Sequence, residues 1–64
     1  MENVTVIGKL KVEILEQTES KILAKRLDTI SDVYEIFTVS NTGVRSFLKT
    51  SKNYEKIVEF YNRL

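Results

Sequence analysis

Apolar and polar residues alternate along the first part of the chain. Over residues 4–14 the even positions are Val, Val, Gly, Leu, Val and Ile, and most of the odd positions between them are polar. A repeat of two is typical of a β-strand with one buried face, so the segment is predicted to form one long strand. Gly8 interrupts the apolar row near its middle, where a missing side chain often marks a bulge or bend. We therefore expect the strand to be kinked at Gly8.

The next segment, residues 21–30, fits two structures. A polar cluster at 17–20 could turn the chain into a second strand, and two strands on either side of such a cluster form the simplest meander. A helix capped by Thr18 would instead align Leu23, Leu27 and Ile30 on one stripe. The strand is the preferred prediction, and the helix is its alternative.

The middle of the chain predicts a β-hairpin. Residues 33–39, VYEIFTV, are rich in β-branched and aromatic side chains, which favour a central strand. The SNTG sequence that follows is typical of a hairpin loop, with Gly43 at the left-handed position. The loop leads into a further strand predicted over residues 44–48.

The last segment predicts an amphipathic helix over residues 51–64, capped by Thr50 or Ser51. Its apolar stripe consists of Tyr54, Ile57, Val58, Tyr61 and Leu64. Together these elements predict a single α+β domain over residues 1–64. It would be an antiparallel meander sheet of three or four strands with the C-terminal helix packed on one face.

The residue types present limit the chemistry of the chain. It has no Cys and no His, so disulfides, thiolate zinc sites and catalysis by thiol or imidazole are excluded. Asp28, Asp32 and Glu35 lie close in sequence, but without the glycine-containing loop of a cation site they are better explained by a turn. The only glycines, Gly8 and Gly43, form no phosphate-binding loop. No enzyme activity, metal or cofactor is expected.

Charge and hydropathy indicate where the protein acts. Ten Lys and Arg against nine Asp and Glu give a net charge of +1, which provides no general attraction to polyanions or membranes. No apolar run approaches the length of a membrane span, and the first residues lack the order of a secretory signal. These features predict an intracellular, cytoplasmic protein.

The predicted central strand carries large apolar residues on both of its faces. One short helix can cover only one face of a sheet, so the other face is expected to lie against a second copy or another protein. The candidate interface residues are Tyr34, Ile36, Phe37 and Phe60. The preferred function is therefore a small non-catalytic interaction or regulatory module that homodimerises or docks on a partner protein.

The alternative function is binding of single-stranded nucleic acid. Strict alternation places Arg45, Phe47 and Lys49 on one strand face, where cations could follow phosphates while bases stack on the aromatic ring. Lys9 and Lys11 would extend that face if the first strand were aligned with it. The near-neutral charge of the chain makes this the second choice.

Overall fold

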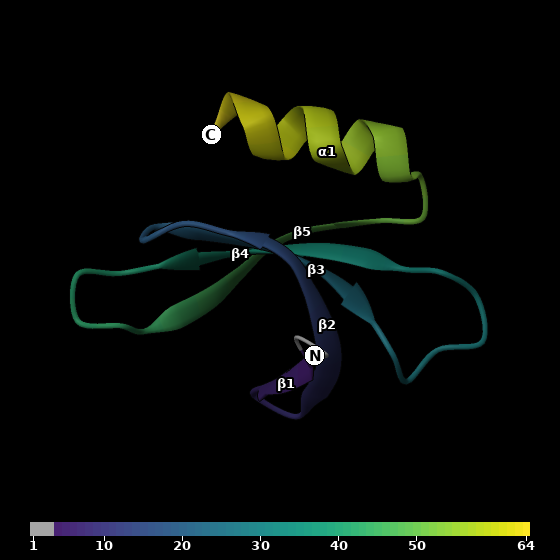
Figure 1. The fold of residues 1–64 in the computed structure, drawn as a ribbon, viewed down its shortest axis with the longest axis horizontal. Helices are drawn as coiled ribbons and strands as arrows, with labels where there is room; N and C mark the ends of the chain where they lie inside the picture. Colours follow the sequence, from purple (N-terminus) through teal and green to yellow (C-terminus); the bar gives the residue numbers. More distant parts are fainter. Residues whose placement is uncertain (1–3) are drawn as a thin grey trace.

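A computed structural model describes residues 4–64 and shows a five-stranded antiparallel sheet with a C-terminal helix (Figure 1). The elements are β1 (Val4–Ile7), β2 (Leu10–Gln17), β3 (Lys21–Arg26), β4 (Tyr34–Val39), β5 (Arg45–Ser51) and α1 (Tyr54–Arg63). Each strand pairs with its neighbours in sequence, in the order β1-β2-β3-β4-β5. The predicted α+β meander with a packed C-terminal helix is confirmed, although the sheet has five strands rather than three or four.

The extra strand arises because the chain reverses at Gly8. The prediction of a single long strand for the N-terminal segment is therefore wrong. Ile7 pairs directly with Leu10, so Gly8 and Lys9 form the two-residue turn of a β-hairpin. Gly8 has a φ of +65° and Lys9 does not have a positive φ, the combination that a type II′ turn requires. The turn leaves Val6 on the outer side of the hairpin, 61% exposed, while Ile7 points inward and is buried.

The segment with two predicted structures forms a strand, β3, from Lys21 to Arg26, and residues 27–33 form the loop to β4. Side chains of β3 and β4 alternate between two faces that are both buried. One face, here called the helix face, carries Leu23 and Ile36 beneath α1. The other, the hairpin face, carries Ile22 and Phe37.

The helix face is covered by two buried residues of α1, Ile57 and Tyr61. The outer members of the predicted stripe, Tyr54 and Leu64, are about half exposed at the two ends of the helix. The helix begins later than predicted, because the Asn53 side chain accepts a hydrogen bond from the Lys56 amide and is the N-cap. No helix within residues 4–64 is long and apolar enough to cross a bilayer.

The hairpin face is covered by the β1–β2 hairpin of the same chain. Figure 1 shows β2 bending steeply out of the plane of β3 and β4, which places β1 on the side of the sheet opposite α1. The pairing of β2 with β3 shifts between Ile14 and Glu16, an irregularity of the kind that bends a strand. Ile7 and Val12 of the hairpin thereby pack in one cluster with Phe37.

The expectation of an uncovered sheet face is therefore wrong. Ile36 is 0% exposed beneath the helix, and Phe37 is 2% exposed beneath the hairpin. The expectation is wrong because residues 4–14 form a hairpin that folds over the sheet, rather than the single kinked strand predicted for them. A strand that is apolar on both faces needs two covers, and this chain provides both.

Lys21 joins the sheet to the end of the helix. Its Nζ donates to the Tyr61 carbonyl over 2.9 Å and lies 4.4 Å from the centroid of the Tyr61 ring. A cation at a helix C-terminus is stabilising, and this one is half-buried. We expect Lys21→Met, which keeps the aliphatic stem, to lower the unfolding free energy by about 1–2 kcal/mol. Urea denaturation measures the change. The exposed Lys56→Met is the control, and equal losses in the two variants would contradict the prediction.

Candidate functional site

The strand β5 forms one edge of the sheet. Within residues 4–64 it pairs with β4 and with no other strand, so the backbone groups along its outer side have no partner strand there. Six of its seven residues are exposed. A free edge of this kind can accept a strand from another chain.

A β-bulge divides β5 in the middle. Lys49 lies opposite Ile36, but Phe47 lies opposite Phe37, so Leu48 is an extra residue in this strand. Directly paired residues share a face of a sheet. Phe47 therefore lies on the hairpin face, where its ring meets the Phe37 ring edge-on at a centroid distance of 6.1 Å.

The bulge also separates the residues predicted to bind nucleic acid. Arg45 lies opposite Val39 and shares the hairpin face with Phe47, whereas Lys49 lies on the helix face. There the Nζ of Lys49 is 4.8 Å from the centroid of the Phe60 ring. The placement of Arg45, Phe47 and Lys49 on one face is thus wrong, because strict alternation fails where a strand contains an extra residue.

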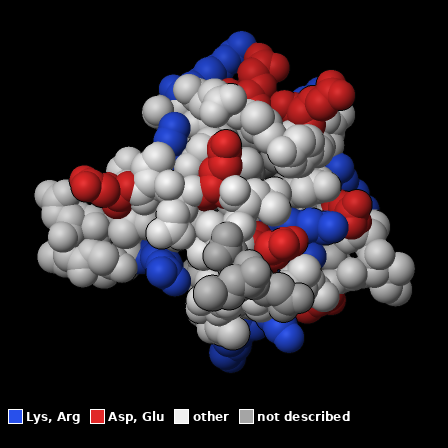
Figure 2. Space-filling model, in the orientation of Figure 1, with Lys and Arg blue, Asp and Glu red and all other residues white. Residues whose placement is uncertain are grey.

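Lys9 and Lys11 do not extend the Phe47 surface. Lys9 is part of the β1–β2 turn, and Lys11 lies opposite Val6 on the outer side of the hairpin. Both are exposed. Figure 2 shows Lys and Arg interspersed with Asp and Glu over the face in view, without a continuous basic surface.

The four residues predicted to form a protein interface do not share one surface. Ile36 and Phe37 are buried on opposite faces of β4, and Phe60 packs partly buried against the core under the helix. Tyr34 is half-buried, with its ring centroid 5.1 Å from that of Tyr54. These side chains mainly hold the fold together.

Several exposed apolar side chains that the sequence pattern did not predict lie on β5 and its loop. Val44 is 59% exposed, Phe47 is 55% exposed and Leu48 is 42% exposed. A signal for them was present, since the last strand of a meander has only one neighbouring strand and is therefore an edge. We call these three residues, together with the free backbone of β5, the β5 edge.

The charged residues of β5 and its flanking loops have one sign. Between Glu35 and Glu55 the sequence contains no acidic residue, and its charged side chains are Arg45, Lys49 and Lys52. Among residues 4–64 the salt bridges are Lys25–Asp32, Arg26–Asp28 and Arg63–Glu59. Within that described part of the chain, none of the three cations near β5 is paired with a carboxylate.

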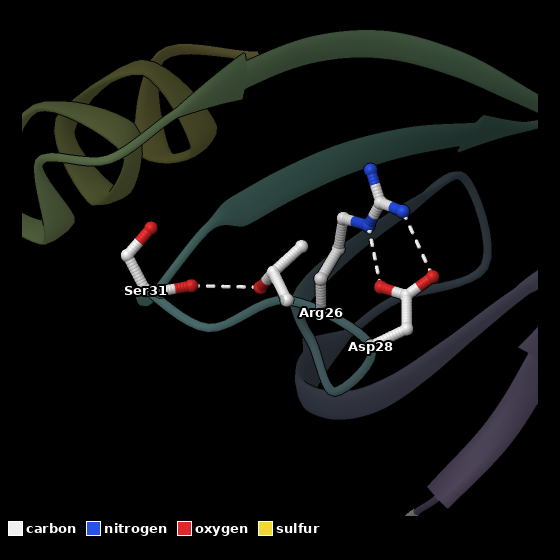
Figure 3. Close-up of polar contacts among 4 residues, drawn as sticks. Arg26, Asp28 and Ser31 are labelled. Atoms are coloured by element: carbon white, nitrogen blue, oxygen red, sulfur yellow. Dashed lines mark hydrogen bonds and ion pairs between the residues drawn. The ribbon is translucent and has the colours of Figure 1, made fainter.

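A buried carboxyl lies deeper on the hairpin face. Glu35, opposite Ala24, is 4% exposed, and its Oε1 has no hydrogen-bond partner within the described residues. Burial raises the pKa of Glu35, and the charge of Arg26 opposes that rise. Arg26 instead donates from Nε and Nη2 to both carboxylate oxygens of Asp28, over 2.9 and 2.8 Å (Figure 3), and this bond lowers the pKa of Asp28.

The carboxylates weighed as a cation site are held by other groups. Asp32 lies 3.3 Å from the Nζ of Lys25, and Asp28 is bound by Arg26. In the loop between them the hydroxyl of Thr29 donates to the carbonyl of Ser31 (Figure 3). Residues 4–64 contain no group of three Asp, Glu, His or Cys side chains placed to hold a metal ion.

The raised pKa of the buried Glu35 carboxyl can be tested by its effect on stability at different pH. Because its pKa is raised in the fold, its contribution to stability is complete below the ordinary value of 4.5 and is lost as pH rises through the raised value. We expect Glu35→Gln to increase the unfolding free energy near neutral pH by about 1 kcal/mol, since it removes an unpartnered buried charge. The gain should shrink below pH 4.5. Thermal denaturation near neutral pH and below pH 4.5 measures this gain in stability. The exposed Glu19→Gln is the control. A gain that does not depend on pH would contradict a raised pKa of Glu35.

A shallow hollow of about 410 Å³ lies between the end of β2 and the end of α1. Its lining residues are Glu16, Gln17, Thr18, Lys21, Tyr61 and Asn62. Burial raises the pKa of the Tyr61 hydroxyl, and the charge of Glu16 raises it further. The Tyr61 hydroxyl is buried and has no hydrogen-bond partner within residues 4–64.

Of the surfaces in the described part of the chain, the β5 edge combines an unpaired backbone, exposed apolar side chains and charge of one sign. The hollow beside Tyr61 is open and polar, and its amine donor, Lys21, is already bound to the helix carbonyls. No protein-family model, curated protein sequence or solved structure matches the chain.

Proposed function

We propose that this chain is a small non-catalytic interaction module that binds another polypeptide through the β5 edge. The observation that supports it is the exposure of Val44, Phe47 and Leu48 on and beside a strand whose outer backbone has no partner strand among the described residues. Proteins that bind an added strand use this combination, with backbone hydrogen bonds for affinity and alternate side chains for specificity. The proposal keeps the interaction function expected from the sequence but moves it from the sheet face to the sheet edge.

The contact between Phe47 and Phe37 prepares Phe47 for binding. Phe37 is fixed in the core, and its ring meets that of Phe47 edge-on, at an angle of 75° between the two planes. A side chain already held in place loses less conformational entropy when a partner covers it. Aromatic anchors of this kind contribute strongly to protein interfaces. Phe47 is therefore the residue expected to dominate partner binding.

Site-specific photo-crosslinking in the native host cell tests the proposal. Phe47 would be replaced by p-benzoylphenylalanine, which is also aromatic, and the same residue would replace Ile30 in the β3–β4 loop as an exposed control. We expect discrete protein adducts from position 47 and none of the same mass from position 30. An absence of adducts at position 47, or identical adducts at both positions, would contradict the proposal.

The nucleic-acid alternative is tested in a separate experiment. Arg45 and Phe47 still share a face, so a base could stack on the ring beside one cation. Titration with a labelled single-stranded oligonucleotide at low and high salt distinguishes the two functions. Binding that falls steeply with salt and is lost in Phe47→Ala would replace the present proposal with nucleic-acid binding.

A further inference from the structure

The local charge of the β5 edge differs from that of the whole chain. Overall, ten Lys and Arg nearly balance nine Asp and Glu, yet three of the cations and none of the acids lie between Glu35 and Glu55. Arg45 and Lys49 belong to β5 itself, and Lys52 follows it directly. A chain that pairs with this edge therefore meets basic side chains at short range.

This charge disfavours a second copy of the same chain as the partner. Antiparallel pairing of β5 with itself would place side by side two strands whose charged residues, Arg45 and Lys49, are all basic. The bulge at Leu48 adds a twist that two identical edges would have to match. Basic residues and bulges on an edge strand are recognised means of preventing self-association.

From these observations we infer that the β5 edge binds an extended acidic segment of another protein, which joins the sheet as a sixth strand beside β5. The inference rests on the function proposed above and specifies the chemistry of the partner. Carboxylates of that segment form ion pairs with Arg45 and Lys49, and its apolar side chains cover Phe47 and Leu48.

The bulge specifies where the carboxylates are needed. Arg45 lies on the hairpin face and Lys49 on the helix face, so the partner strand presents acidic side chains on both of its faces. Lys49 is held above the Phe60 ring but carries three donor hydrogens, which leaves its ammonium able to bind a carboxylate. The apolar side chains are needed on the hairpin face, next to Phe47.

Selection from a displayed library of random peptides of strand length tests the inference on the full chain. We expect the selected peptides to combine Asp or Glu with β-branched or aromatic residues. Their synthetic forms should bind about tenfold more weakly to the double variant Arg45→Glu with Lys49→Glu. The control, Lys9→Glu with Lys11→Glu, changes the net charge equally at exposed sites of the β1–β2 hairpin. A proline at the centre of a selected peptide should abolish binding, because it interrupts the backbone pairing.

The outcomes separate this inference from the proposed function. Selection of neutral or basic peptides that require Phe47, or a concentration-dependent dimer that Phe47→Ala dissociates, overturns the acidic partner and leaves the β5 edge as an interaction site. Acidic peptides that tolerate the central proline overturn the sixth strand, and acidic peptides that bind the two double variants equally overturn the recognition of carboxylates by Arg45 and Lys49. If no peptide is selected and no crosslink forms at position 47, both the inference and the proposed function are wrong.

Discussion

Phe37→Ala is expected to unfold much of the protein at room temperature. Phe37 is 2% exposed in the cluster that joins the β1–β2 hairpin to the sheet, with Ile7, Val12 and Ile22 around it. Truncation of a buried phenylalanine to alanine costs about 3–5 kcal/mol. A domain of this size rarely has more than about 3–5 kcal/mol of stability from its core. The expected loss therefore equals most of the stability available, and circular dichroism during urea denaturation measures it.

Phe47→Ala is the matched control, because the same side chain is removed from the other member of the aromatic pair. Phe47 is more than half exposed, so its edge-on contact with Phe37 is the main interaction lost. We expect its unfolding free energy to fall by about 1 kcal/mol. If Phe37→Ala remains as stable as Phe47→Ala, the hairpin does not cover the sheet as described, and Phe37 returns as a candidate interface residue.

The sequence pattern predicted most of the sheet but not its first turn. Val4 and Val6 continue the even-numbered apolar row of β2, although they lie on the outer side of the hairpin. A two-residue turn changes which positions face inward, from odd in β1 to even in β2. The even-numbered apolar residues therefore form one unbroken pattern in the sequence, although those of β1 and those of β2 lie on opposite sides of the hairpin. The pairing of Ile7 with Leu10 and the left-handed conformation of Gly8 distinguish this turn from the predicted kink.

The candidate site was less predictable because it depends on one inserted residue. Nothing in the local sequence marks Leu48 as the bulge, and alternation alone places Phe47 and Lys49 on the same face. The lack of a hydrogen-bond partner for Glu35 Oε1 was difficult to predict for a different reason. Alternation correctly groups Glu35 with Phe37, but the engagement of Arg26 by Asp28 depends on the shape of the β3–β4 loop.

The second large effect is expected at the contact between the helix and the sheet. Ile57 is 0% exposed and packs with Leu23 and Ile36 of the helix face and with Tyr61 of α1. A ten-residue helix is too short to be stable alone in water, so its structure depends on this contact. We expect Ile57→Ala to lower the unfolding free energy by about 2–5 kcal/mol. Amide hydrogen exchange should also become faster in β3 and β4 beneath the helix.

Ile30→Ala makes the same chemical change at a fully exposed position in the β3–β4 loop. We expect it to change stability by no more than about 0.5 kcal/mol, because no buried contact is removed. A comparison of these two isoleucines separates burial from side-chain identity. If Ile57→Ala were as mild as Ile30→Ala, the helix would not be packed on Leu23 and Ile36. The helix face would then be free for a partner, and the original expectation of an exposed sheet face would replace the β5 edge as the basis for function.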